Sequence, residues 1–315
     1  MRVLLVYFSG CGYTLWTAKK MAALLSAQGH DVAGVLNIEQ YAPAERESSE
    51  RHIFLMPTYF FGPPALVVKA LNNIPMVADK EAVVVATSGG QQGLTTAYAR
   101  SLLKDRGYKV IGTASLLMPD TFLFLKFSQQ SPEQKLERMK KAEEELKTLC
   151  AKCVGTEEFS ADRSRAYALI SFPFLWFFRR AFGLSFISTD ACTHCGQCER
   201  ECPMHCITLK DGRPSWKANC MCCFRCINRC PAKAIDVSFV SWILGACGAV
   251  VGWTLARWIF SFAGSFLSAF LALIGVAYGC IAGVAVGQKI YRKIAQLPLL
   301  AKRRREVCED LEKGL

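Results

Sequence analysis

Three features are missing from this sequence of 315 residues, and each absence excludes a class of protein. The first residues, MRVLLVYFSG, contain a short apolar run but no small-residue cleavage site, so we expect a first β-strand there and not a signal peptide. Residues 237–287 hold a single charged side chain, Arg257, which leaves nothing polar to cover an outer face in water. A nicotinamide-binding motif is absent beyond one glycine-containing loop at residues 9–14, so no nicotinamide cofactor is expected.

Cysteine, in contrast, is abundant. Ten of the sixteen cysteines fall between Cys192 and Cys230, most of them in CxxC steps rather than scattered as a disulfide framework would be. We therefore expect a reducing compartment, in which densely spaced cysteines bind metal.

Two copies of the motif C-x2-C-x2-C-x3-C-P begin at Cys192 and Cys220, with a period of 28 residues. The repeat extends beyond the cysteines, because Ile207 matches Ile235. Three cysteines two residues apart wrap a turn around one [4Fe–4S] cluster, and the fourth, before proline, lies on the far side and binds the other cluster. Crossed ligation predicts one set of Cys192, Cys195, Cys198 and Cys230, and a second set of Cys220, Cys223, Cys226 and Cys202.

Structural zinc sites are the alternative, since zinc also takes four thiolates. Zinc does not explain the repeated x3-Cys-Pro ending, so the spacing favours two [4Fe–4S] clusters. Cys206 aligns with Ala234 in the repeat and is expected to be a small buried thiol, whereas Cys222 aligns with His194. Residues 189–236 as a whole resemble bacterial two-cluster ferredoxins, which implies a small α+β domain that transfers electrons.

The first 150 residues alternate apolar strands with helices, which indicates an α/β fold with a doubly wound parallel sheet. The expected strands are Arg2–Phe8, Ile53–Met56, Ala82–Ala86 and Tyr108–Leu116, and the expected helices are Tyr13–Gln28, Leu94–Arg106 and Pro132–Cys153. Cys150 and Cys153 form a CxxC step on the last helix, for which we favour a structural role over a redox pair.

Ligands bind such sheets at the carboxyl ends of the strands, where three loops are candidates. In the first loop, the glycines and the helix N-terminus suit a phosphate. The second offers aromatic rings, and the third has a backbone that can approach a flat polar ring. The predicted site residues are Ser9, Gly10, Cys11, Gly12, Tyr13 and Thr14 in the first loop, Pro57, Thr58, Tyr59 and Phe60 in the second, and Thr87, Ser88, Gly89 and Gly90 in the third.

The first loop has the form Ser-x-x-Gly-x-Thr, and on this motif residues 1–154 resemble flavodoxins, which implies bound FMN. Cys11 and Tyr13 stand where many relatives have Thr and Asn, but both positions mainly offer backbone to the phosphate. Cys11 could instead mark a redox-sensitive thiol, and the fold could bind no flavin. The order of the modules, together with residues 212–216, resembles the flavodoxin–ferredoxin fusion proteins of anaerobes.

The nearly uncharged stretch is long enough for two membrane spans of about 20 residues each. A transmembrane helical hairpin is expected, with spans at 239–256 and 266–287 and glycines at every fourth position that permit close packing. Seven basic residues between Lys289 and Arg305 mark the side that holds both hairpin ends as cytoplasmic. Nucleic-acid binding is a weaker explanation of the formal charge of +12, and no nucleic-acid partner is expected.

The predicted domains are 1–154, flavodoxin-like; 155–188, an aromatic-rich linker or interfacial segment; 189–237, ferredoxin; 238–288, membrane hairpin; and 289–315, a basic cytoplasmic tail. Together they predict an electron-transfer protein, anchored in the cell membrane, that relays electrons between an unidentified redox protein donor and acceptor at the cytoplasmic face. No catalytic residue is predicted. Two alternatives remain, a flavin and iron–sulfur oxidoreductase acting on a quinone or another substrate, and a non-catalytic redox sensor or assembly scaffold.

Overall fold

The computed structural model describes residues 1–41, 49–78, 80–122, 130–162, 182–259 and 265–294. The chain divides into two compact units between Phe172 and Pro173, and each unit is described by itself. Most of the aromatic segment expected at 155–188, and the basic tail from residue 295 onward, lie outside the described residues.

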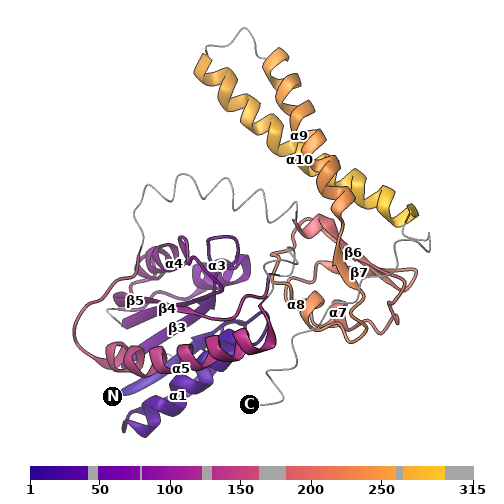
Figure 1. Ribbon diagram of the computed structural model, residues 1–315. Coiled ribbons are helices and arrows are strands. Elements are labelled where there is room, and N and C mark those ends of the chain that lie inside the picture. The colour runs from indigo at the N-terminus through magenta and orange to yellow at the C-terminus, as the bar shows by residue number, and fades with distance from the viewer. Residues whose placement is uncertain (42–48, 79, 123–129, 163–181, 260–264, 295–315) are drawn as a thin grey trace. The chain divides into compact units, whose positions relative to one another are not determined.

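A five-stranded parallel sheet, in the order β2-β1-β3-β4-β5, is the centre of the first unit (Figure 1). This 2-1-3-4-5 order is that of flavodoxin-like doubly wound folds. Its central strands are nearly continuous apolar runs because helices cover both faces of the sheet. The strands are β1 (Arg2–Tyr7), β2 (Asp31–Asn37), β3 (Arg51–Pro57), β4 (Glu81–Ser88) and β5 (Lys109–Leu117).

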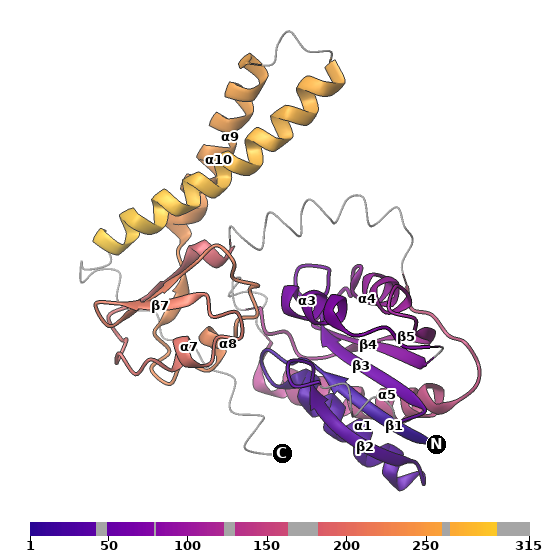
Figure 2. The ribbon, with the colours of Figure 1, turned by 180° about the vertical axis from the view of Figure 1, so that it is seen from behind.

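Four helices enclose this sheet in two pairs (Figures 1 and 2). Helices α1 (Tyr13–Ala27) and α5 (Pro132–Val154) pack together on one face, and α3 (Ala65–Asn73) and α4 (Thr95–Lys104) pack on the other. Alternate residues of the strands meet the first pair in the main core. This core includes Val3, Leu5, Ile53, Leu55, Val83 and Val85 from the sheet, and Met21, Leu25, Leu146 and Leu149 from the helices.

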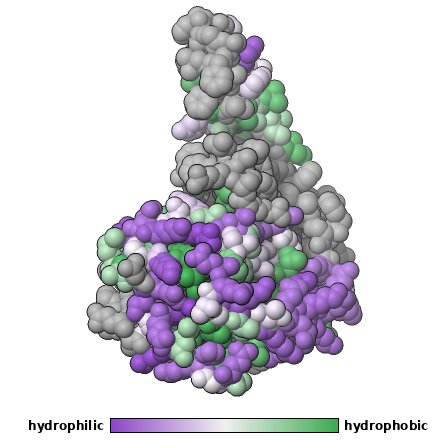
Figure 3. Space-filling view, turned by 90° about the vertical axis from the view of Figure 1, so that its left-hand side faces the viewer, coloured by the Kyte–Doolittle hydropathy of each residue, from purple (hydrophilic) through white to green (hydrophobic). Residues whose placement is uncertain are grey.

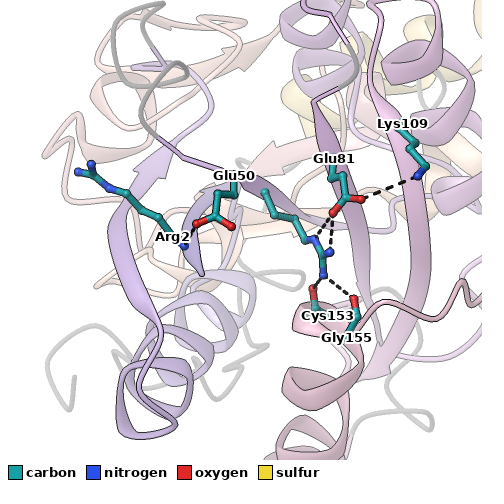
Figure 4. Close-up of polar contacts among 7 residues, drawn as sticks. Arg2, Glu50, Glu81, Lys109, Cys153 and Gly155 are labelled. Atoms are coloured by element: carbon teal, nitrogen blue, oxygen red, sulfur yellow. Dashed lines mark hydrogen bonds and ion pairs between the residues drawn. The ribbon is translucent and has the colours of Figure 1, made fainter.

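The amino-terminal edge of the sheet is joined to the end of α5 by a buried arginine. The guanidinium of Arg51, on β3, donates hydrogen bonds to the backbone carbonyls of Cys153 and Gly155, each at 2.8 Å, and pairs with the carboxylate of Glu81. Figure 4 shows these acceptors, with Lys109 on the far side of Glu81. This group of contacts lies at the opposite edge of the sheet from the three predicted ligand loops.

The second unit begins with two small antiparallel pairs, β6 (Phe186–Ser188) with β9 (Ile235–Val237), and β7 (Ile207–Lys210) with β8 (Arg213–Trp216). Two one-turn helices, α7 (Gln197–Arg200) and α8 (Arg225–Asn228), each contain the third cysteine of a motif, Cys198 and Cys226. Strand β6 lies just before residue 189 and pairs with the last strand, so it belongs to this small α+β fold.

A helical hairpin follows, made of α9 (Phe239–Ile259) and α10 (Ser265–Ile294), so that the second helix continues past the end expected at residue 287. The two helices approach closely at glycines. A Cβ atom at Gly248 would lie 2.1 Å from the carbonyl oxygen of Gly279, and one at Gly252 would lie 2.0 Å from that of Gly275. Glycine is therefore required at this contact.

The transmembrane assignment of this hairpin is not supported. None of the helices, over the residues described, reaches the combination of length and apolarity that crossing a bilayer requires. The helical hairpin expected from the sequence is present, but the structure gives no membrane span.

Replacing Arg51 with alanine is expected to lower the free energy of unfolding of the first unit by about 3 kcal/mol, because two buried carbonyls lose their donor and Glu81 loses its guanidinium partner. Amide hydrogen exchange of β3 and β4 in the intact chain measures this change. Arg2→Ala is the control, since Arg2 makes an exposed ion pair with Asp31 and should cost less than about 1 kcal/mol. Equal effects of the two substitutions would contradict the prediction.

Candidate iron–sulfur and flavin sites

The motif cysteines of the second unit face a common space. It measures about 760 Å³, including what is open to solvent, and apolar side chains such as Phe186 and Trp216 close part of its wall. The cysteines that line it are Cys192, Cys195, Cys198, Cys202, Cys206, Cys220, Cys223, Cys226 and Cys230. Cys222 is also buried, but it is not part of this lining.

One group of thiols forms around Cys198. Burial, together with the neighbouring thiols of Cys192, Cys230 and Cys195, raises the pKa of the Cys198 thiol to about 11. Three of these cysteines belong to the first motif, whereas Cys230 is the last cysteine of the second. The structure thus brings together the four residues of the first predicted set.

In the other group, a cysteine of the first motif, Cys202, lies among cysteines of the second motif. Burial raises the pKa of Cys223 and of Cys226, and the thiol of Cys202 contributes to the rise in both. A hydrogen bond with Cys206 lowers the pKa of the Cys220 thiol, but a hydrogen bond to Cys222, burial and the neighbouring thiol of Cys223 outweigh it and raise this pKa. The thiol of Cys202 therefore lies near cysteines of the second motif. Together with Cys220, Cys223 and Cys226, Cys202 makes up the second predicted set.

The internal repeat is also present in the backbone. Residues with positive φ, five of them not glycine, occur in three pairs 28 positions apart, and these left-handed residues produce the turns that wrap each motif around its site. The pairs are His194 (φ 58°) with Cys222 (φ 56°), His205 (φ 46°) with Lys233 (φ 50°), and Gly196 (φ 72°) with Phe224 (φ 57°). The strained conformation is kept at both sites because the turns are needed to aim the thiols inward.

The buried thiols are suited to act as ligands of a metal cluster. Iron binding requires thiolates, and thiols whose pKa is raised by burial must release their protons when iron enters. Among the described residues, no three His, Cys, Asp or Glu side chains converge closely enough for a single metal ion. A [4Fe–4S] cluster is instead surrounded by its four thiolates.

Basic side chains hold the cysteine loops in place. Arg200 donates a hydrogen bond to the backbone carbonyl of Cys195 at 2.7 Å, and Arg225 donates one to the carbonyl of Glu201 at 3.1 Å. Arg229 pairs with the carboxylate of Glu201, also at 3.1 Å. Arg225 and Arg229, from the second motif, thus hold Glu201, beside the fourth cysteine of the first.

In the first unit, the three predicted loops meet at Thr87. The hydroxyl of Thr14, from the first loop, lies 2.7 Å from the hydroxyl of Thr87, in the third. The backbone N–H of Thr58, in the second loop, donates to the carbonyl of Thr87 at 2.8 Å. Because parallel strands end at the same edge of the sheet, loops far apart in sequence form one site.

The first loop fits an anion. Helix α1 begins at Tyr13, and its N-cap residue is Gly12, which provides no side-chain cap. Gly12 has a φ of 100°, a conformation that L-residues rarely adopt, and its N–H donates to the Ser9 hydroxyl at 3.0 Å. A helix N-terminus whose backbone N–H groups are not capped by a side chain can bind a phosphate. Cys11 is half-buried in this loop.

A fourth loop, after β5, belongs to the same edge and was missed in the sequence. The ring of Phe122 meets that of Phe60 edge to face, with centroids 6.0 Å apart. Asp120 lies against Gly89, where a Cβ atom would be 2.9 Å from the Asp120 Cα. Burial raises the pKa of the Asp120 carboxyl. The sequence did contain a signal for this loop. The strand before it was predicted, and in a parallel sheet the carboxyl end of that strand lies at the same edge as those of the other strands.

Cys150 and Cys153 lie away from this edge. Both are buried in the main core, and burial raises the pKa of the Cys150 thiol to about 11. Neither is in a disulfide. A neutral buried thiol is a weak nucleophile, so these residues serve packing.

Comparisons with known proteins give matches in each half of the chain. A family model described as a 4Fe-4S binding domain matches residues 186–208, which include the first motif. Curated proteins give no match. Similar solved structures are an archaeal flavodoxin (15% identity, 48% of this chain and 99% of that chain, TM-score 0.33), two-electron reduced Megasphaera elsdenii flavodoxin (25%, 45%, 98%, 0.34) and a C101S mutant of Pseudomonas aeruginosa flavodoxin (17%, 49%, 100%, 0.35). The match to a 4Fe–4S binding domain supports an electron-transfer role.

Proposed function

We propose that this chain is a membrane-attached electron carrier that holds two [4Fe–4S] clusters and FMN, and that passes electrons between a donor and an acceptor redox protein. One observation carries the proposal. The motif cysteines of the second unit line one space, in which Cys198 lies beside Cys230 of the other motif as well as beside Cys192 and Cys195, and Cys202 of the first motif lies beside Cys223 and Cys226.

The geometry of these groups suits rapid transfer between clusters. All eight thiols line the same space, so two bound clusters would be neighbours. When bound, each cluster supplies a carrier of one electron and FMN a carrier of one or two. The surrounding Phe186, Trp216 and Phe224 exclude water from the space, and burial of this kind influences the reduction potential.

FMN is assigned to the carboxyl edge of the sheet in the first unit. The N-terminus of α1 would receive the phosphate, with Gly12 allowing the backbone to approach it. The isoalloxazine ring would lie among the other loops, where Tyr59, Phe60 and Phe122 offer aromatic surface and Thr87 links the loops.

Membrane attachment is assigned to the α9–α10 hairpin. Apolar side chains lie on its described surface (Figure 3), and Trp258 is 77% exposed, which is costly in water. The other large apolar residues exposed on the described part of the hairpin are Ile243, Val250, Val251, Trp253, Leu255, Ile259, Ile274, Tyr278, Val286 and Ile290. We assign the redox units to the cytoplasmic side, because the basic residues after the hairpin favour that side.

Replacing Cys230 with serine should lower the iron content from about eight to about four atoms per chain, because Cys230 completes the group formed by the first motif. Spectroscopy of the anaerobically purified variant should show loss of the cluster bound by Cys192, Cys195 and Cys198. Cys222→Ala is the matched control, as this cysteine is buried but does not line the cluster space, and it should keep all the iron. Loss confined to the cluster of Cys220 and Cys223 would refute crossed ligation.

Replacing Gly12 with valine should abolish FMN binding, because the side chain occupies the phosphate approach and valine disfavours a φ of 100°. The flavin released from wild-type and variant protein is counted by absorbance, with one FMN per chain expected for wild type. Gly29→Val is the control. It has similar strain, with a φ of 84°, but it lies in open space after the other end of α1 and should retain flavin. A wild-type protein that takes up no FMN would remove the flavin from the proposal.

The protein should remain in the membrane fraction in about 1 M salt and leave only with detergent, because salt screens charges but does not weaken apolar contact with lipid. Reporter tags at both termini should lie on the cytoplasmic side, and a tag inserted within residues 260–264 should report whether the hairpin crosses the bilayer. Removing residues 295–315 tests the basic tail and should leave attachment intact. Release by salt alone would contradict attachment through the hairpin.

A further inference from the structure

Cys206 is a buried thiol beside the second group of cluster ligands, and neither predicted set includes it. It is 1% exposed, and its Sγ lies 3.4 Å from the Sγ of Cys202. Its other thiol neighbours are Cys220 and Cys223. All three neighbours belong to the same group of four, so Cys206 contacts one cluster site and not the other.

The internal repeat provides a built-in comparison. The position equivalent to Cys206 in the second motif is Ala234, whose backbone N–H donates to the Sγ of Cys230 at 3.3 Å. The backbone N–H of Cys206 reaches Cys202 in the same manner. The two sites therefore share a backbone donor to the fourth cysteine, but the second site has a thiol where the first has a methyl group.

A thiol beside the ligand sulfur can stabilise negative charge on that sulfur, whereas a methyl group cannot. Reduction adds one electron to a cluster, and part of the added negative charge is carried by the thiolate sulfurs. A hydrogen bond to such a sulfur stabilises the reduced form more than the oxidised form, and hydrogen bonds to the sulfurs are among the factors that set cluster potentials. The Cys206 Sγ lies within hydrogen-bond distance for sulfur of the Cys202 Sγ. A thiolate ligand has no proton to donate, so with iron bound to Cys202 the donor of this pair is the S–H of Cys206.

We propose that Cys206 is a positioning residue that raises the reduction potential of the cluster held by Cys202, Cys220, Cys223 and Cys226, by donating an S–H···S hydrogen bond to Cys202. The inference rests on the proposed function, since it needs both clusters to be present. Because Ala234 offers no such donor, the effect falls on one cluster and makes the pair unequal.

The test is a redox titration of the purified, cluster-loaded full chain, followed by electron paramagnetic resonance, in wild type and in Cys206→Ala. The variant copies the residue that the repeat already accepts at Ala234, so the fold should tolerate it. One of the two potentials should become more negative while the other stays unchanged, with iron still at about eight atoms per chain. Cys206→Ser keeps a donor and should shift that potential less than alanine does.

The reciprocal variant, Ala234→Cys, should raise the potential of the other cluster. Unchanged potentials in Cys206→Ala, or equal shifts of both, would overturn the inference. A loss of iron in Cys206→Ala would also overturn it, because the thiol would then hold iron or the fold. A wild-type protein without clusters would instead refute the proposed function itself, so the two failures are distinguishable.

Discussion

Crossed pairing of the two cysteine motifs is the constraint on which the second unit depends. For Cys202 to reach the thiols of the second motif, and Cys230 those of the first, the chain must fold back on itself with near twofold symmetry. The paired left-handed residues, the two one-turn helices and the short strands all follow from this requirement. Two-stranded sheets alone are marginally stable, so metal ligation and the buried aromatic rings are expected to supply much of the stability.

In the first unit, the parallel sheet brings residues that are distant in sequence together. Its parallel strands must end at one edge, and this brings together hydroxyl groups as distant in sequence as Thr14 and Thr87. The opposite edge is held by the buried Arg51, which ties the sheet to the last helix. Stability and ligand binding are therefore placed at opposite ends of the strands, so the loops can vary without loss of the core.

The hairpin has glycines between its two helices and large apolar side chains on its outer surface. Glycines on the inner faces allow the helix backbones of α9 and α10 to approach closely. The larger side chains are left on the outside, where Val250 and Trp258 are among the most exposed. An apolar partner would cover this outer face, and lipid is the partner that we propose.

The sequence by itself determined the parts of this protein that depend on local spacing. The cysteine repeat, the central strands and the long helices were readable because apolar periodicity and motif spacing act within a few residues. Strand β2 was missed because it is an edge strand of only intermediate burial, without a strong apolar run. The tertiary structure alone decided that the loop of Asp120 and Phe122 joins the predicted flavin edge, and that Cys206 lies against Cys202 while Ala234 takes its place in the other half. Such contacts join residues through folded strands and turns, and their distances are fixed only when the whole core is packed.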